Sequence, residues 1–371
     1  MSTPASTITA SAPGKVVLWG EYAVLMGAPA LVMAVNRYAT CRLEPSGTPG
    51  WQVSASGFHA AAATPGRRQL LDPDTAPGHP VWDVLWHVLC SLPSDQTANL
   101  PDRIRAHFDT GAFHQHGAKL GLGSSAALCV AVYGAVCRLL GRTRQLEEAL
   151  AAHRRLQGSA RGENQARGEN HARGGSARGE ENEARGKGEN EAPGGVTAGS
   201  GIDVAAAWQG GTLRCQREQG SLVALPWKPP QELLVSCIWT GTSASTREHL
   251  ARLRDWLAKG RGRELDDLGA RTAGLFEADP CLEALADYVT ALEALDRAAG
   301  LGIFSESHRR LGRLAIEAGV VYKPCGAGGG DVGAAFARSE NAIERFNRLA
   351  NAAGFLPLAL ETASHGIEVT G

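Results

Sequence analysis

The segment GLGSSAA, residues 121–127, places two glycines and two hydroxyl side chains directly before a long apolar run. A glycine-rich turn that leads into a helix presents free backbone N–H groups and the positive end of the helix dipole, which together bind phosphate. A serine hydroxyl there can also complete the oxygen shell of a phosphate-bound Mg²⁺. Alternatively, Ser124 or Ser125 can cap the helix, because a hydroxyl accepts from the free amides of the first turn. The segment therefore indicates a phosphate site, a capped helix, or both.

This segment is not a Walker A loop, because the pattern GxxxxGK[ST] is absent and no lysine follows the glycines. Lys119 precedes them and can reach a phosphate as a mobile point charge. A second glycine cluster, KPCGAGGGDVG, spans residues 323–333 and contains a GxGxxG match. No complete βαβ unit surrounds it, so a dinucleotide site is poorly supported. A loop that joins two strands and approaches a ligand with its backbone fits this cluster better.

Two further stretches contain charged residues in unusual surroundings. APGKVVLWGEYAVLMG places Lys15 before an apolar strand and Glu21 after a glycine, although such residues taken alone are typical of a solvated surface. SGIDVAAAWQGG places Asp203 ahead of small and apolar residues, where an aspartate is as typical of a helix N-cap as of catalysis. A metal site at His114, His116 and His107 is a weaker alternative, because HxH alone is a poor signal.

The elements that must position these residues are strands and helices in clusters. Periodicity and turn signals predict strands over 14–25, 29–45, 210–218, 232–241, 320–326, 332–337 and 357–362. They predict helices over 80–92, from residue 124 onward, and over 143–158, 246–260, 280–300, 306–319 and 339–354. Strands that cluster, rather than alternate one for one with helices, indicate an α+β fold.

Composition limits the classes of function. The 371 residues carry a formal net charge of −1 with 43% hydrophobic and 20% charged residues, so no global field recruits nucleic acid or an anionic membrane. The eight cysteines form no CxxC pair and several lie in apolar runs, which indicates buried reduced thiols. The first residues show no signal-peptide pattern and no stretch has membrane-spanning length, so we expect a cytoplasmic protein.

One segment differs from the rest in composition. Ala-Arg-Gly recurs at 160, 166, 172, 177 and 184, and no Leu, Ile, Val, Met or aromatic residue occurs between Ser159 and Pro193. Such a segment cannot bury enough apolar surface to offset its conformational entropy. We therefore predict a disordered low-complexity insertion at about 158–197; the alternative is an interaction surface made by its Arg and Glu residues.

Taken in order, APGKVVLWGEYAVLMG, GLGSSAA and CGAGGGDVG resemble the three motifs of the GHMP small-molecule kinases. The resemblance spans most of the chain. It implies an α+β fold with a ribosomal protein S5 domain 2-like N-terminal domain, expected at 1–222, and a ferredoxin-like C-terminal domain, expected at 223–371. ATP, Mg²⁺ and a small-molecule acceptor would meet between them, in a monomer or a homodimer. The insertion departs from the family pattern, in which AHRRLQG would run almost directly into GSGIDVAAA.

Within the family, KLGLGSSAA, IWTGTSAST, GAGGGD and SGIDVAAA are most similar to the phosphomevalonate kinases. This similarity implies ATP-dependent phosphorylation of (R)-5-phosphomevalonate to 5-diphosphomevalonate in the mevalonate route to isoprenoids. The alternatives are a mevalonate kinase or another GHMP kinase, a diphosphomevalonate decarboxylase, and a non-catalytic homologue.

The resemblance also implies roles for individual residues. Lys15 and Asp203 would be catalytic, and Ser125 would be a Mg²⁺ ligand. The ATP phosphates would lie on Lys119, Gly121, Leu122, Gly123, Ser124, Ser125 and Ala126. The acceptor would contact Ser245, Thr246, Gly326, Ala327, Gly328, Gly329 and Asp331. Lys15, Lys119, Lys323 and Arg247 are the candidate cations for two anions that meet in one site.

Overall fold

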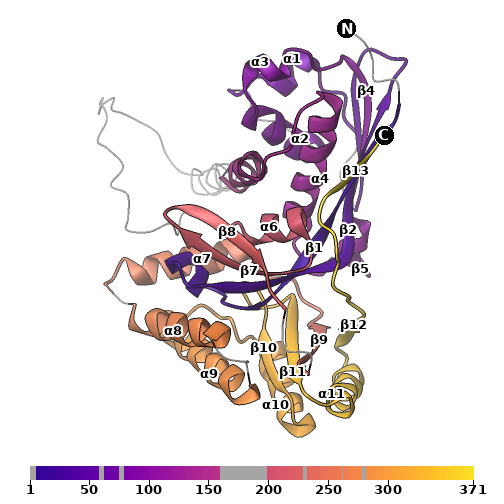
Figure 1. Cartoon of the computed structure of the whole chain (residues 1–371). Helices are drawn as coiled ribbons and strands as arrows, with labels where there is room; N and C mark the ends of the chain where they lie inside the picture. The colour runs from indigo at the N-terminus through magenta and orange to yellow at the C-terminus, as the bar shows by residue number, and fades with distance from the viewer. Residues whose placement is uncertain are drawn as a thin grey trace, which may run out of the picture.

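The computed structural model describes residues 6–57, 62–74, 79–158, 199–228, 232–260, 262–277 and 281–371. Apart from residue 158, which ends a helix over 146–158, the insertion expected at about 158–197 lies outside these ranges. Figure 1 shows two sheets, one in each half of an elongated molecule, with α6 and α7 at the level between them. The chain is thus α+β, as the sequence predicts.

The first sheet contains most of the N-terminal strands. Its strands in the described residues are β13 (Glu368–Thr370), β1 (Ile8–Trp19), β2 (Ala30–Pro45), β4 (Arg103–Asp109) and β3 (Gly50–Ser56), in that order, with β7 (Thr212–Glu218) paired to β2 and β8 (Ser221–Pro226) paired to β7. All neighbouring pairs are antiparallel except β3 with β4. The β1–β2 register shifts at Pro13/Gly14, just before Lys15. Such an irregularity bends a strand, so β1 is bent next to Lys15.

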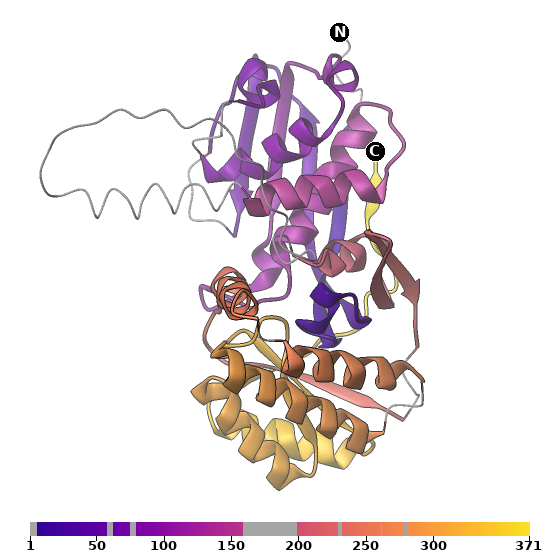
Figure 2. The ribbon, with the colours of Figure 1, turned by 90° about the vertical axis from the view of Figure 1, so that its left-hand side faces the viewer.

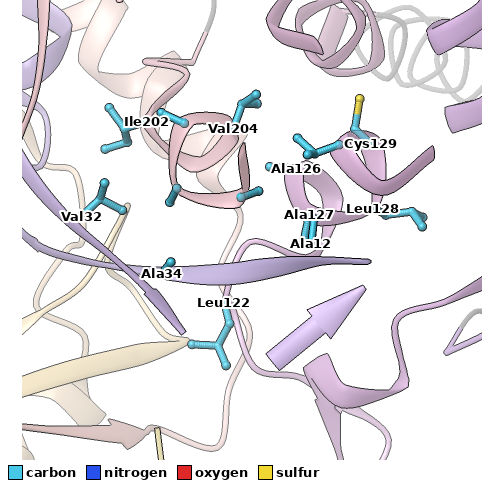
Figure 3. Packing of buried hydrophobic residues seen from close by; sticks show 14 of the residues in the cluster. Ala12, Val32, Ala34, Leu122, Ala126, Ala127, Leu128, Cys129, Ile202 and Val204 are labelled. Carbon is cyan, nitrogen blue, oxygen red and sulfur yellow. The ribbon is translucent and has the colours of Figure 1, made fainter. Parts of the chain in front are cut away.

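The helices of the N-terminal half pack on the first sheet. They are α1 (Arg67–Leu71), α2 (Pro80–Ser91), α3 (Ser94–Thr97), α4 (Ser124–Leu139), the helix over 146–158 and α6 (Ile202–Gln209), with the short 3₁₀ helices η1 (Ala23–Met26) and η2 (Gly111–Phe113) and the hairpin β5 (His114–Gln115)–β6 (Ala118–Lys119). All residues of α4 from Ala126 to Cys137 are buried, which fits a helix that is apolar on every side. Figure 3 shows α4 and α6 side by side over the strands that carry Ala12 and Ala34. The small alanines allow this close packing, which brings the N-termini of two helices together.

The second sheet has the order β10 (Val321–Pro324), β11 (Val332–Ala337), β9 (Leu234–Trp239) and β12 (Leu356–Leu358), all antiparallel. Its helices are α7 (Thr246–Leu257), α8 (Arg263–Glu277), α9 (Leu282–Ala299), α10 (Glu306–Ala318) and α11 (Glu340–Ala352). The hairpin β10–β11 encloses the second glycine cluster, so the prediction of a loop between two strands is confirmed.

The two halves share a core centred on Trp19 at the end of β1. Its ring lies 5.6 Å from Trp227, 5.8 Å from Phe276 of α8 and 6.4 Å from Phe336 of β11, measured between centroids. The chain end also returns to the first half, where β13 pairs with β1 (Figure 1). The domain division at 222/223 stays a prediction; this position falls within β8, and the first strand of the second sheet, β9, starts at Leu234.

Candidate active site

The candidate site is a cavity of about 480 Å³ between the two halves of the molecule. The N-terminus of α4, the start of α6, η1, the first three turns of α7 and the β10–β11 loop all contribute walls. Of the residues that the sequence predicts for the site, the cavity is lined by Lys15, Lys119, Gly121, Gly123, Ser125, Ala126, Asp203, Ser245, Thr246, Arg247, Gly326, Ala327 and Asp331. The three sequence motifs are therefore brought together at one place.

The 121–123 loop is held against β1 by both backbone and side chain. Lys15 N donates to Leu122 O at 2.8 Å. Gly123 has φ +80°, and a Cβ there would lie 3.0 Å from Lys15 Cγ. The stem of Lys15 thus lies across a position where only glycine fits, by conformation and by space. At the far end of that stem, a Cβ on Gly326 would lie 3.8 Å from Lys15 Nζ. Lys15 therefore spans from the second motif to the third.

The two serines of GLGSSAA have different surroundings. Gly123 is the N-cap of α4 and no side chain caps this helix, so the prediction that Ser124 or Ser125 is the cap is wrong. Ser124 is 6% exposed and does not line the cavity, whereas Ser125 is exposed and does. The amides of the first turn of α4 therefore have no side-chain cap as acceptor. The hydroxyl of Ser125, in the same turn, faces the cavity. This arrangement suits a bound anion.

Asp331 joins the second and third motifs. A Cβ on Gly121, which has φ +76°, would lie 2.3 Å from Asp331 Cβ. Asp331 itself has φ +58°, and its Oδ1 accepts from Ala244 N at 3.3 Å in the loop before α7. Desolvation raises its pKa, opposed by the Ala244 N–H and by the charges of Lys15 and Lys119. Desolvation also lowers the pKa of Lys119, and the charge of Lys15 adds to this while Asp331 opposes it.

Asp203 lies in the first turn of α6, after Gly201, which has φ +81°. Its Oδ1 accepts from Val204 N at 3.0 Å, and its side chain is half-buried at the cavity wall. Helix α6 packs beside α4 (Figure 3), and Asp203 lines the same cavity as Ser125 of the first turn of α4.

Glu21 and Lys323 differ from the sequence-based expectation. Glu21 is 4% exposed rather than a surface residue, and Lys323 is completely buried. Lys323 Nζ lies 2.5 Å from Glu21 Oε1, and Tyr288 of α9 donates to Glu21 Oε2 at 2.5 Å. Burial acts to lower the pKa of Lys323, but Cys325 and Glu21 outweigh it and the pKa is raised. Lys323 is therefore a paired core cation, and it does not line the cavity as a candidate for binding an anion.

The β10–β11 loop is fixed from several sides. Tyr22, which has φ +61°, donates to Ala327 O at 2.5 Å. Gly328 and Gly329 do not line the cavity: Cβ atoms on them would lie 2.5 Å from Ile303 and 2.8 Å from His249 respectively. These two glycines pack against Ile303 and His249, and their contact with an acceptor stays a prediction. Leu122, also expected to contact ATP, is buried outside the cavity lining.

Several cavity residues were missed by the sequence-based reasoning. Tyr22, His153 and Arg254 all line the cavity. His153 and Arg254 lie within ordinary amphipathic helices without a motif, whereas Tyr22 lies within the first motif, directly after Glu21. Only the packing of elements distant in sequence places them together. The eight cysteines are free thiols, as predicted, and the described residues contain no cluster of three or more His, Cys, Asp or Glu side chains suited to a metal.

Comparisons with known proteins add the family context. No family model matches the chain. A phosphomevalonate kinase from a Streptomyces species is 28% identical over 99% of this chain and all of that protein. A mevalonate kinase from Pyrococcus horikoshii is 25% identical over 98% of this chain and 97% of its own.

Solved structures match over nearly the whole length. A Listeria innocua protein superposes with a TM-score of 0.74 at 20% identity, covering 98% of this chain and 99% of that one. Streptococcus pneumoniae phosphomevalonate kinase, solved with phosphomevalonate and AMPPNP, gives 0.67 at 18% identity, covering 95% and 99%. This chain has the GHMP kinase fold. Within the GHMP kinase fold, the cavity lies where the three motifs that carry the sequence resemblance converge. No helix in the described residues is both long and apolar enough to cross a bilayer.

Proposed function

We propose that this protein is an ATP-dependent phosphotransferase that converts (R)-5-phosphomevalonate to 5-diphosphomevalonate. The observation that carries the proposal is the position of Lys15, whose stem crosses Gly123 and whose ammonium reaches Gly326. Lys15 lies between the N-terminus of α4 and the β10–β11 loop. A cation in this position reduces the repulsion between two anions that must approach each other. Phosphoryl transfer requires mainly such positioning and charge stabilisation.

The nucleotide phosphates bind at the α4 end of the cavity. The residues of this loop that line the cavity are Gly121, Gly123, Ser125 and Ala126, and they would face the phosphates together with the Lys119 ammonium and the exposed hydroxyl of Ser125. The hydroxyl of Ser125 and the carboxylate of Asp203 are hard oxygen donors that fit Mg²⁺ shared with phosphate oxygens. Bound there, the ion would neutralise charge on the phosphates. Lys15 holds the transferred phosphoryl group from the β1 side.

The acceptor lies between Lys15, Asp203 and the start of α7. A phosphate monoester has a second pKa of about 6, so at neutral pH the acceptor is mostly dianionic and needs no strong base. Asp203 then orients Lys15 or a metal-bound water instead of removing a proton. Ser245 and Thr246, at the N-terminus of α7, are neutral donors to the acceptor phosphate. The N–H groups of this first turn add to them.

The similarity to a phosphomevalonate kinase over 99% of the chain supports this acceptor, and the similarity to mevalonate kinases names its main rival. The test is coupled ADP release with Mg-ATP and, separately, (R)-5-phosphomevalonate and (R)-mevalonate. Turnover of the phosphate ester alone is expected. Turnover of mevalonate alone would replace the proposal with a mevalonate kinase in which Asp203 must act as a true base. Carbon dioxide release from 5-diphosphomevalonate would indicate a decarboxylase, and silence on all of these would exclude the proposed reaction.

A further inference from the structure

The cavity extends along α7, away from the phosphate-binding loop. The start of α7 is fixed beside Asp331, because Ala244 N donates to Asp331 Oδ1 at 3.3 Å. Arg247, Leu250 and Arg254 all line the cavity, which shows that one face of this helix forms a wall for more than two turns. At a rise of about 1.5 Å per residue, Arg254 lies about 12 Å along the helix from Thr246. The far end of the cavity therefore has a cation of its own.

The guanidinium of Arg254 has only a weak contact with the rest of the described structure. Its Nε contacts the Leu250 carbonyl at 3.4 Å, and within the described part of the chain no carboxylate forms an ion pair with it. A half-buried guanidinium without an anionic partner retains most of its donors for a ligand. Arg252, two residues earlier, differs because it donates to Leu301 O at 2.8 Å and has a structural contact.

His153 faces the same cavity from another wall. It is only 3% exposed, yet among the described residues its ring makes no hydrogen bond. His153 lies in the helix over 146–158 and Arg254 in α7, so the two residues reach the cavity from different helices (Figure 2). An imidazole that lines a cavity and makes no hydrogen bond within the described part of the chain is available for a polar group of a ligand.

Apolar side chains also line the cavity, and one of them, Leu250, lies between Thr246 and Arg254 on α7. Leu25 of η1, Ile202 of α6 and Leu250 of α7 line the cavity together. The cavity thus has an anionic-ligand end at α4, an apolar middle and a second cationic end at Arg254. A ligand that matches this order has a phosphate at one end, a short hydrocarbon chain, and an anion at the other end.

We propose that Arg254 and His153 form the subsite that recognises the carboxylate of the acceptor. The inference rests on the function proposed above, since it assumes that the acceptor receives the phosphoryl group beside Lys15. Guanidinium and carboxylate form paired, parallel N–H···O bonds, which fix the orientation of the acceptor as well as its affinity. Arg254 is a specificity-determining residue in this arrangement. A neutral alcohol or sugar would leave the Arg254 guanidinium without an anionic partner, so the subsite discriminates against such acceptors.

The test compares acceptors with and without the carboxylate. The acceptors are (R)-5-phosphomevalonate, (R)-mevalonate and the C1 primary amide of each, with Mg-ATP held saturating. The variants are Arg254→Met, Arg254→Lys and His153→Gln, and the control is Lys259→Met, which removes an exposed cation just beyond α7. Thermal unfolding is followed for each variant, so that a folding defect is recognised.

In the wild type, the acid is expected to exceed its amide in kcat/KM by about 10- to 100-fold, the range for a charged hydrogen-bonded contact. Arg254→Met should lose that preference through the KM of the acid, leaving the KM of ATP and the amide kinetics unchanged. Arg254→Lys should retain part of the preference for the acid over its amide, and His153→Gln should weaken that preference. Lys259→Met should behave as the wild type.

The outcomes separate the two proposals. If phosphomevalonate and its amide are equally good substrates in both wild type and Arg254→Met, the subsite is wrong and the function stands. If only mevalonate is phosphorylated and its acid preference collapses in Arg254→Met, the function is wrong and the subsite stands. If no carboxylate-bearing acceptor is turned over, both are overturned.

Discussion

Lys323 Nζ lies 2.5 Å from Glu21 Oε1 in a pair that is fully enclosed by the protein. Lys323 also donates to Val17 O at 3.4 Å, and the Tyr288 hydroxyl, which donates to Glu21, accepts from Gly20 N at 3.0 Å. The pair thus joins the turn after β1 to β10, the strand that leads into the second glycine cluster. The position of Lys15 relative to Gly326 depends on this junction, because the two residues lie on its two sides.

Breaking this pair should be costly, whereas replacing both partners should be tolerated. Glu21→Gln or Lys323→Met alone leaves a buried group without its partner, and each is expected to lower the unfolding free energy by about 3–5 kcal/mol. The double variant should recover most of that loss. Urea unfolding of the wild type, the two single variants and the double variant measures these free energies. A loss in the double variant equal to the sum of the two single losses would contradict the pairing.

Gly121→Ala should be more harmful than its backbone conformation alone explains. The new Cβ would lie 2.3 Å from Asp331, in addition to the strain of φ +76°. Gly220→Ala is the matched control, since Gly220 has φ +84° and nothing lies within 4 Å of a Cβ there. The control should cost about 1–2 kcal/mol. Gly121→Ala should cost more and should cost less in an Asp331→Gly background, as measured by unfolding free energy and kcat.

Lys15 and Asp203 should differ in their effect on turnover. Lys15→Met removes the cation between two phosphoryl groups and should reduce kcat by about 10³-fold. Asp203→Asn should reduce it by less than about tenfold with a phosphate acceptor, because no proton must be removed. Steady-state kinetics with phosphomevalonate distinguish the two. Equal losses would give Asp203 the role of a general base.

Acid should destabilise the protein through His308. Its Nε2–H donates to Gly330 O at 2.9 Å and its Nδ1 accepts from the Tyr322 hydroxyl at 2.8 Å. Burial lowers its pKa from 6.5 to about 4. Between these values the unfolded chain binds a proton that the folded chain does not, so the unfolding free energy falls as pH decreases, by up to about 3 kcal/mol. His308→Gln should flatten this part of the pH profile; an unchanged slope would contradict it.

Replacing residues 160–197 with a six-residue Gly-Ser linker should preserve activity. Gln157 Oε1 accepts from Gly199 N at 3.3 Å, so the chain ends that flank this segment are adjacent and a short linker can join them. Loop-closure entropy predicts a gain of about 1.6 kcal/mol in unfolding free energy. Thermal unfolding and the ADP-release assay measure both effects. A loss of kcat would show that the segment contributes to the site.

The sequence predicts the parts of the site that depend on local backbone chemistry. The glycines at 121 and 123, the helix after them and the strand–loop–strand at 321–337 follow from residue type and spacing. The serine cap was predicted wrongly because Gly123 in a left-handed conformation already begins α4. Helix α8 was missed, since Gly269 and Gly274 lie within it and weaken the helical signal.

Long-range pairing is what the sequence does not reveal. Glu21 appears as a surface residue until Lys323, about 300 positions later, is placed against it. His153 and Arg254 look like ordinary helix residues until two helices face one cavity. The strand β13 is too short to show a period of two. Burial, charge pairing and sheet edges are properties of the assembled fold.

The pairing of β13 with β1 has a consequence for synthesis on the ribosome. β1 is synthesised long before β13, so its outer edge stays uncovered until residues 368–370 follow. During this interval the backbone groups of Thr9–Ser11 on that edge are open to strands of other nascent chains. The strand that carries Lys15 is therefore exposed to mispairing while the residues between β1 and β13 are made, and a fusion that delays docking of β13 would prolong that exposure.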